Sequence, residues 1–316
     1  MRTSLLTFLG DSQGGSSPVD AYVRDLRAAR DQGFYFAWTV QLPWEHDALI
    51  TLAVALREVD GIRVGTGVQP IQMRHPMALA QEALTLSVLS GGRFSLGIGL
   101  SHAVVSEGMW GIPWDRPVRR INDYLDCLLP LLTTGEVDAV GQTSTARGQI
   151  RVPGAPPPPV YLAALGPQML QIAGRRTAGT ITWMTGPHTL AGYVVPTLHA
   201  AAEDAGRHAE VIAAVPICIT DDPATARTTA AEIYAVYGTL PSYRAMLDRE
   251  GAAGPADIAI IGDEQAVTER IEEIRATGVA EISAHIFGSN PEERDRTRAF
   301  LRPPQALPRS NSVPAD

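Results

Sequence analysis

The sequence contains no lysine, and all 26 of its basic residues are arginines. Schiff-base and P-loop chemistries, and any mechanism with a lysine general base, are therefore excluded. The 316 residues include 34 acidic side chains, which gives a net charge of −8 and an isoelectric point near 5.4. Proteins that neutralise a nucleic-acid backbone normally carry charge of the opposite sign, so we expect no nucleic-acid partner.

Cysteine is scarce, and long apolar runs are absent. Cys127 and Cys218 lie far apart and form no C-x-x-C motif, which excludes a disulfide framework and a zinc ribbon and favours a reducing, cytoplasmic location. The apolar run near the N-terminus spans about six residues and is more typical of a strand than of a signal peptide. Because no run approaches the ~18 apolar residues of a membrane span, we expect no membrane association.

Metal-ligand spacings are missing as well. The seven histidines form no H-x-H, H-x-x-x-H or H-E-x-x-H motif, so we expect no metal site and regard a metal-dependent barrel hydrolase as remote. A G-x-S-x-G elbow is absent, which leaves a serine hydrolase without support. His75, at a helix start, and His102, after a glycine-rich strand end, are the histidines best placed for proton transfer, although each could simply hydrogen-bond a loop.

What the sequence does contain is an almost unbroken alternation of strand-like apolar runs with helix-like periodic runs. This alternation is typical of βα units that build a parallel sheet. The predicted strands are Thr3–Leu9, Phe34–Trp38, Ile62–Val68, Arg93–Ile98, Val160–Ala163, Gly179–Trp183, Val211–Ile219 and Glu281–Phe287. They predict a single (β/α)8 TIM barrel with insertions in its βα loops and with its chemistry at the C-terminal ends of the strands.

We assign residues 1–301 to this one domain. The first helix is signalled by Ser17 as N-cap, by the proline that follows it and by Gly33 after its end. The stretch Gly141–Gly148 has no periodicity and predicts a polar surface excursion, and the run Pro156–Pro159 predicts a stiff extended connector. Residues 302–316, rich in proline and serine, predict a disordered tail.

Two strand ends carry paired glycines, Gly65 with Gly67 and Gly97 with Gly99. Neither pair has the third glycine of the G-x-G-x-x-G fingerprint, which argues against a Rossmann fold. Such pairs either pack tightly at the barrel rim or let a flat ring lie against the backbone, and both interpretations stay open. Another strand ends at Gly166–Pro167, where the free amides of the next helix suit a phosphate but also fit an ordinary turn.

Six long segments follow the order of the predicted barrel. They are GTGVQPIQMRHPMALAQEALTL at 65–86, GGRFSLGIGLSH at 91–102, GMWGIPWDRP at 108–117, VPGAPPPPVYLAALGPQMLQIAG at 152–174, TWMTGP at 182–187 and LPSYRAMLDREGAAGPADIAIIGDEQAV at 240–267. Together they make the chain resemble the luciferase-like flavin and deazaflavin oxidoreductases, and most closely the coenzyme F420-dependent branch. The resemblance extends to about Leu301.

The resemblance implies a barrel that holds an isoalloxazine-type ring at its C-terminal mouth, with the phosphate near the loop after the fifth strand. It also implies a cis peptide at Gly67–Val68, in a bulge behind the ring. The residues it implies for the cofactor are Gln41, Gly67, Val68, Gln69, Gly99, Leu100, Ser101, Gly166, Gln168, Met169 and Trp183.

The mechanism that the resemblance implies is hydride transfer between C5 of the deazaflavin and an organic substrate. This chain departs from the deazaflavin sugar dehydrogenases, because residues 40–42 read Val-Gln-Leu where their second strand ends in an Asp-His pair, and Leu100 replaces their acidic residue. We therefore expect reduction of an activated C=C or C=O, with a proton from His102 or from solvent. The side chains of Trp110, Trp114, Tyr243 and Met246 predict a partly apolar substrate.

Several alternatives remain open at this point. FMN could replace F420, which would favour a monooxygenase, and a non-catalytic flavin-binding barrel belongs to a different class of function. Arg74 and Arg120 could meet the negatively charged oligoglutamate tail of F420, or they could be solvated surface residues. The helix Met77–Leu89 could mediate a homodimer, or it could pack entirely inside its own barrel.

Overall fold

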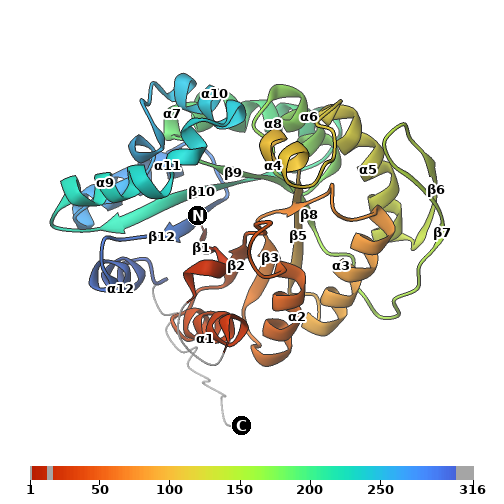
Figure 1. Ribbon diagram of the computed structural model, residues 1–316, viewed down its shortest axis with the longest axis horizontal. Coiled ribbons are helices and arrows are strands. Elements are labelled where there is room, and N and C mark those ends of the chain that lie inside the picture. The colour runs from red at the N-terminus through yellow and green to blue at the C-terminus, as the bar shows by residue number, and fades with distance from the viewer. Residues whose placement is uncertain (1, 13–16, 304–316) are drawn as a thin grey trace, which may run out of the picture.

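The computed structural model describes residues 2–12 and 17–303. Eight parallel strands close into a barrel, and helices surround it (Figure 1). In ring order the strands are β1 (Arg2–Thr7), β2 (Phe36–Thr39), β3 (Arg63–Thr66), β5 (Phe94–Gly99), β8 (Val160–Leu162), β9 (Gly179–Trp183), β10 (Glu210–Ile219) and β12 (Glu281–Ile286). Because β12 pairs with β1 and β10 pairs with β9, the ring is closed, which confirms the predicted TIM barrel.

The helices follow the strands as predicted, and many begin at a polar cap. The principal ones are α1 (Pro18–Asp31), α2 (Ala48–Glu58), α3 (Pro76–Ser90), α5 (Pro117–Thr133), α6 (Pro167–Arg176), α8 (Val195–Asp204), α9 (Pro223–Ile233), α10 (Pro241–Glu250), α11 (Glu264–Ala276) and α12 (Pro291–Phe300). The Ser17 hydroxyl accepts a hydrogen bond from the Asp20 amide at the start of α1, which confirms the predicted N-cap. Short helices α4 (Ala103–Gly108) and α7 (Pro187–Thr189) lie in the loops after β5 and β9.

The paired glycines first serve the packing of the barrel interior. A Cβ atom on Gly65 would lie 2.6 Å from the Trp38 ring, and one on Gly97 would lie 2.0 Å from the carbonyl oxygen of Thr66. Neither position can carry a side chain without displacing the neighbouring strand or ring. Tight packing is therefore the reason for the first glycine of each pair, whereas Gly67 and Gly99 lie nearer the mouth.

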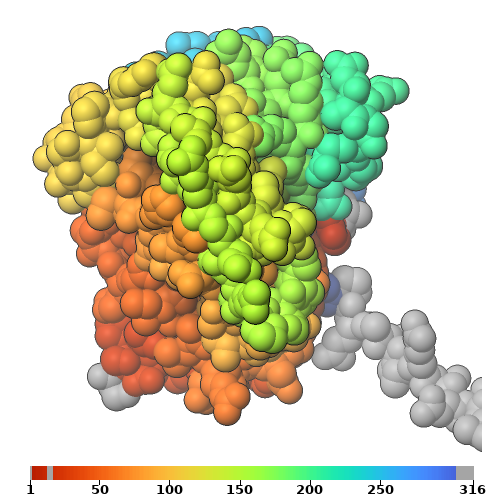
Figure 2. Space-filling model, turned by 90° about the vertical axis from the view of Figure 1, so that its right-hand side faces the viewer, coloured from red at the N-terminus to blue at the C-terminus, as the bar shows by residue number. Residues whose placement is uncertain are grey.

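The structure contains strands that the sequence pattern did not predict. The stretch Gly141–Gly148 lies on the surface, as predicted, but it has regular structure that was not predicted: it belongs to an antiparallel hairpin of β6 (Glu136–Val140) and β7 (Thr145–Gln149). Its apolar periodicity is weak because most of its side chains face solvent, and only one residue of each strand is buried against α5. In Figure 2 the hairpin region lies across the outer surface in yellow-green.

Two further strands are too short to show periodicity. The bulge after β3 continues into β4 (Gln69–Pro70), which pairs with β5, and β11 (Ile260–Gly262) extends the sheet beside β10. Of the predicted tail 302–316, all but the first two residues lie outside the described part of the chain. Within the described residues, no helix combines the length and apolar character needed to cross a membrane.

The N-terminal end of the barrel interior is closed by hydrogen bonds to one buried carboxylate, that of Glu281. It accepts from the Trp38 indole nitrogen at 2.8 Å and from the hydroxyls of Ser4 and Tyr35. Nearby, Arg2 donates to Glu210 at 2.8 Å. This polar base leaves the C-terminal mouth as the open end of the barrel.

Candidate active site

The inner surface at the mouth is apolar and partly aromatic. Phe8, Val40, Val68 and Trp183 pack there against the buried Leu6 and the other inward-facing side chains of the barrel. These residues come from the ends of four different strands or the loops that follow them. The mouth can therefore receive a flat apolar group without leaving large polar surfaces uncovered.

The bulge and the end of β5 form one smooth wall of this mouth. The Gly67–Val68 peptide is cis, as the family resemblance implied. The Gly67 amide donates to the Thr39 carbonyl at 2.7 Å, and the Ile71 amide donates to the Gly99 carbonyl at 3.0 Å. A Cβ on Gly99 would lie 2.9 Å from the Val68 side chain, so glycine allows the Val68 side chain to pack directly against the backbone of residue 99.

Two buried polar atoms at the mouth lack a hydrogen bond of ordinary geometry to any described residue, although the Tyr237 hydroxyl lies near the Trp183 indole nitrogen. Within the described residues, neither Gln69 Oε1 nor Trp183 Nε1 makes a hydrogen bond of ordinary geometry. Buried polar groups are nearly always paired, and an unpaired one costs about 1–3 kcal/mol. One acceptor and one donor are thus available to a bound molecule.

The loop after β8 leads into α6 with Gly166 as its N-cap residue. The first intrahelical bond runs from the Leu170 amide to the Gly166 carbonyl, so the amides of Gln168 and Met169 precede the hydrogen-bonded ladder. Gly166 and Gln168 are exposed. The helix dipole and these amides suit an anion, as at any helix start, so the phosphate site in this loop stays a prediction.

Three of the other predicted cofactor residues, Gln41, Leu100 and Ser101, already contact other parts of the protein. The Gln41 amide is committed inside its own loop, because Oε1 accepts from the Ala48 amide at 2.8 Å and Nε2 donates to the Leu42 carbonyl at 2.9 Å. Leu100 packs against the main core. The Ser101 amide donates to Gln72 Oε1 at 3.4 Å, which ties the loop after β5 to the loop before α3.

The structure separates the two histidines that were predicted for proton transfer. His75 caps α3: its Nδ1 accepts from the Met77 amide at 3.3 Å, and its Nε2 lies 3.0 Å from the Thr145 carbonyl. Both nitrogens are therefore used to hold loops together. The His102 ring instead lies 5.5 Å from the ring of Tyr243, and burial lowers the pKa of its imidazole.

The predicted substrate residues do not form one group. Tyr243 packs edge-on against Tyr237, with ring centroids 5.1 Å apart, and Met246 is buried on the same helix, α10. Trp110 and Trp114 lie half-exposed between α4 and α5 and, within the described residues, make no ring contact with that aromatic group. Tyr237 also contacts Trp183 edge-on, with centroids 5.8 Å apart.

Comparison with known proteins agrees with this geometry. The family model described as luciferase-like monooxygenase matches residues 1–281. The chain belongs to the luciferase-like monooxygenase family. This confirms the family predicted from the six segments, and it makes the chain an enzyme of the oxidoreductase type, as predicted.

One similar protein is named as a coenzyme F420-dependent oxidoreductase of Mycobacterium tuberculosis. It is 30% identical over 234 residues, which cover 67% of this chain and 66% of that protein. Two solved structures share the fold at 21% identity. The F420-dependent tetrahydromethanopterin reductase of Methanopyrus kandleri has a TM-score of 0.79, covering 95% of this chain and 97% of that one, and the monooxygenase RslO1 of Streptomyces bottropensis has 0.76, covering 96% and 98%.

In this luciferase-like barrel, sequence reasoning missed a histidine at the end of β12. His285 Nε2 lies 2.9 Å from a carboxylate oxygen of Asp11, and Nδ1 lies 2.7 Å from the Tyr234 hydroxyl. The imidazole also packs against Phe8, with ring centroids 4.8 Å apart. A signal was available, because residues 281, 283 and 285 of the predicted strand alternate with apolar ones and so face inward.

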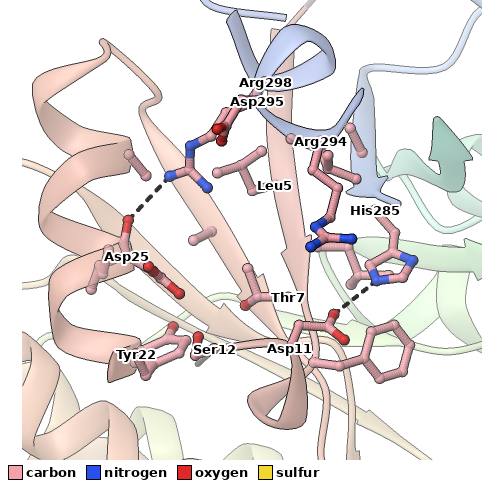
Figure 3. Close-up of a pocket in the computed structure, with 17 residues that line it drawn as sticks. Leu5, Thr7, Asp11, Ser12, Tyr22, Asp25, His285, Arg294, Asp295 and Arg298 are labelled. Atoms are coloured by element: carbon pink, nitrogen blue, oxygen red, sulfur yellow. Dashed lines mark hydrogen bonds and ion pairs between the residues drawn. The ribbon is translucent and has the colours of Figure 1, made fainter. Parts of the chain in front are cut away.

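His285 and Asp11 also reach a cavity of about 210 Å³ between α1 and α12 (Figure 3). Arg298 donates there to the Asp25 carbonyl at 3.1 Å, and the side chain of Arg294 projects toward the His285–Asp11 pair. Among residues 2–12 and 17–303, no cluster of His, Cys, Asp and Glu could hold a metal ion.

Proposed function

We propose that the protein is a coenzyme F420-dependent oxidoreductase that reduces an activated C=C or C=O bond of a small, partly apolar substrate. The main support for the proposal is the arrangement of residues at the mouth of the barrel. Val68 and Gly99 form a flush wall there, next to an unpaired acceptor on Gln69 and an unpaired donor on Trp183. The name of the mycobacterial relative supports the deazaflavin as the cofactor.

The residues of the mouth fit such a group. Val68, Gly99 and Trp183 would hold its ring, and the α6 amides of Gln168 and Met169 would hold its phosphate. When bound, the deazaflavin supplies a carbon that gives or takes a hydride. The chain supplies orientation, exclusion of water and control of one proton.

The aromatic residues Tyr237 and Tyr243 would exclude water from the mouth. Tyr237 and Tyr243 are half-buried, and burial raises the pKa of Tyr237 to about 12, so its hydroxyl stays protonated near neutral pH. The proton falls to His102, because an imidazole nitrogen there can hold a proton and release it to the substrate. The lowered pKa of His102 makes the cation a stronger acid than an exposed histidine.

The end of β2 limits where the proton can come from. Val40 offers neither an acid nor a base, and the Gln41 amide is committed to the Leu42 carbonyl and the Ala48 amide. The donor in reduction of a carbonyl is the base in oxidation of the alcohol, so this lack affects both directions alike and leaves His102 or solvent to carry the proton. We favour reduction of an activated bond, for which solvent can also supply the proton.

A second candidate is an FMN-dependent monooxygenase. The apolar wall and the α6 amides would fit FMN as well, and the Streptomyces relative in fold is named a monooxygenase. Titrations of the apo-protein with oxidised F420 and with FMN, followed by tryptophan fluorescence, separate the two candidates. Micromolar or tighter F420 binding with much weaker FMN binding supports our proposal. The reverse preference would sink it in favour of the monooxygenase, and binding of neither would favour a different function.

We also propose a homodimer through the outer surfaces of α2 and α3. Ile50 and Val54 on α2, and Val88 and Leu89 on α3, expose large apolar side chains, and the two helices are packed together. Exposed apolar patches of this kind often mark interfaces between subunits. Light scattering after gel filtration measures the molar mass, and a monomer at high protein concentration would refute the dimer.

A further inference from the structure

The carboxylate of Glu250, the last residue of α10, ties the segment between β10 and β11 to the loop after β9. Its Oε1 accepts a hydrogen bond from the His188 amide at 3.1 Å, and its Oε2 accepts one from the Thr189 amide at 2.7 Å. The two amides lie 62 and 61 residues before Glu250 in the sequence. The carboxylate therefore joins two loops that follow different strands of the barrel.

Glycine at position 186 makes room for this carboxylate. A Cβ atom on Gly186 would lie 2.3 Å from the carboxyl carbon and from Oε1 of Glu250. The φ angle of Gly186 is −83°, which any residue adopts, so the carboxylate and not the backbone disfavours a side chain there. At Gly192, on the same segment, a Cβ would meet no described atom within 4 Å. The close fit is a property of the turn 186–189.

This turn begins shortly after Trp183, and the residues between are constrained. Met184 has a left-handed backbone with a φ angle of +53°, which residues other than glycine rarely adopt. Its side chain is fully buried and belongs to one apolar cluster with Leu247 of α10. The Thr185 hydroxyl donates to the Trp183 carbonyl at 3.2 Å. The chain that leaves β9 is thus fixed against α10 from residue 184 onward.

The position of the Trp183 ring depends on this backbone. Its indole nitrogen makes no hydrogen bond of ordinary geometry with any described residue, although the Tyr237 hydroxyl lies near it. The ring has aromatic neighbours, with centroids 5.8 Å away at Tyr237 and 6.1 Å away at Phe8. Because the rotamers open to a side chain depend on the backbone angles, a shift of residues 183–186 would move the indole.

The same helix also contacts the end of another strand. The ring of Tyr243, on α10, lies 5.5 Å from the ring of His102, which follows β5. At the other end of α10, the Arg249 guanidinium lies 4.0 Å from the centre of the Tyr193 ring, in the segment after β9. Helix α10 therefore connects the predicted ring contact Trp183 with the predicted proton donor His102.

We infer that Glu250 is a positioning residue: by holding the turn 186–189 against α10, it sets the place of Trp183 at the mouth and thereby the affinity for the deazaflavin ring. The inference rests on the proposed function, since it takes Trp183 as a contact of the bound ring. A carboxylate that only caps a turn adds stability and leaves binding unchanged. A positioning residue changes binding as well, because small displacements of a contact group weaken it.

The test is a double-mutant cycle of Gly186→Ala and Glu250→Ala, with oxidised F420 as the ligand and tryptophan fluorescence as the signal of binding. Gly186→Ala should push the carboxylate away from the two amides, and Glu250→Ala removes it, so each should weaken F420 binding by about three- to tenfold. In the double variant the added methyl group meets no carboxylate, and the affinity should equal that of Glu250→Ala. Gly192→Ala is the matched control and should leave the affinity unchanged.

The position of Trp183 can also be followed without any cofactor. In protein labelled with 5-fluorotryptophan, the fluorine resonance of Trp183 is assigned by its loss in Trp183→Phe. This resonance should shift in Gly186→Ala and in Glu250→Ala and should stay in place in Gly192→Ala. A carboxylate that contributed stability alone would leave it unmoved.

Thermal melts show whether each variant is folded. Gly186→Ala and Glu250→Gln, which keeps one acceptor oxygen, remain informative if Glu250→Ala unfolds. Lower melting temperatures with unchanged F420 affinity and an unchanged Trp183 resonance would overturn the inference, because Glu250 would then be a cap and nothing more. Additive losses of affinity in the double variant would overturn it as well. If the wild type binds no F420, the proposed function fails, whereas the fluorine shift still decides whether Glu250 positions Trp183.

Discussion

The two ends of the barrel interior differ in the hydrogen bonding of their buried polar groups. At the N-terminal end, the Glu281 carboxylate accepts hydrogen bonds from Ser4, Tyr35 and Trp38. At the mouth, Gln69 Oε1 and Trp183 Nε1 are buried without partners among the described residues. Between the two ends, the buried Ser283 hydroxyl also lacks a partner among the described residues, so unpaired polar atoms are not confined to the mouth. The donors around Glu281 meet their acceptor within the chain, whereas we propose that a bound molecule pairs with Gln69 and Trp183 at the mouth.

The unpaired groups at the mouth cost free energy, and this cost is an argument that the mouth is the functional end. Leaving a buried donor or acceptor unpaired costs about 1–3 kcal/mol, so a fold tolerates it chiefly where a ligand restores the bond. Burial and the nearby Glu281 carboxylate both raise the pKa of Tyr35, which keeps its hydroxyl protonated as a donor. The base therefore contributes stability, and we propose that the mouth contributes binding.

The largest expected effect is at the base. Glu281→Ala leaves the buried Ser4 hydroxyl, the buried Trp38 indole nitrogen and the half-buried Tyr35 hydroxyl without their acceptor, and should lower the free energy of unfolding by about 3–5 kcal/mol. Urea denaturation measures this change. Glu272→Gln, which removes an exposed carboxylate paired with Arg275, is the control and should change stability by less than about 1 kcal/mol. Comparable losses in both variants would mean that the base is not a special source of stability.

At the mouth, the next largest effect should appear in binding rather than in stability. Gly99→Ala places a Cβ 2.9 Å from the Val68 side chain and should push that side chain out of the flush wall. We expect the affinity for F420 to fall about tenfold, as overpacking costs ~1–3 kcal/mol. Gly108→Ala is the control, because a Cβ there meets no atom within 4 Å. Unchanged F420 affinity in Gly99→Ala would argue that the ring binds elsewhere.

A smaller effect, and a pH dependence, should come from His102. Burial lowers the pKa of its imidazole, so the protonated donor forms only as the pH falls below 6.5. If His102 supplies the proton, kcat for reduction should rise as the pH falls through that range, and His102→Gln should lower kcat about tenfold and abolish the rise. A pH profile that is the same in both proteins would exclude this role.

The same lowered pKa has a consequence for stability with a fixed sign. The unfolded chain binds a proton at His102 more readily than the native one, so stability from this group is fully present above pH 6.5. It is lost as the pH falls from 6.5 through the lowered native pKa. Denaturation at several pH values should therefore show a loss at acidic pH that is smaller in His102→Gln.

The barrel was predictable because its strands and helices carry strong periodic patterns. In Glu281–Ile286 the outward residues are apolar, and β9 was predicted with its observed bounds. The hairpin β6–β7 and the strand β11 were not predictable in this way. The hairpin has one buried residue in each strand, so its apolar pattern is weak. Strand β11 is only three residues long, and its partner β10 lies far earlier in the sequence.

Among the predicted site residues, the sequence singles out only those whose proposed role depends on backbone geometry. Gly67, Gly99 and Gly166 stand out because glycine at a strand end has few other uses. Gln41 and His75 were chosen by position, but the sequence gives no sign that their polar atoms are used inside loops. His285 was missed because its partners, Asp11 and Tyr234, lie 274 and 51 residues away.

The smallest expected effect tests whether His285, with its partners Asp11 and Tyr234, stabilises the fold or takes part in the chemistry at the mouth. Tyr234→Phe removes the 2.7 Å hydrogen bond to His285 Nδ1 and leaves Nε2 against Asp11. If the pair is structural, unfolding free energy should fall by about 1 kcal/mol with kcat unchanged. Tyr193→Phe, at a half-buried ring that packs against Arg249 away from this group, is the matched control and should change neither stability nor kcat. A drop in kcat without a loss of stability in Tyr234→Phe would instead assign His285 to the mouth, because a purely structural hydrogen bond would not alter the chemical step.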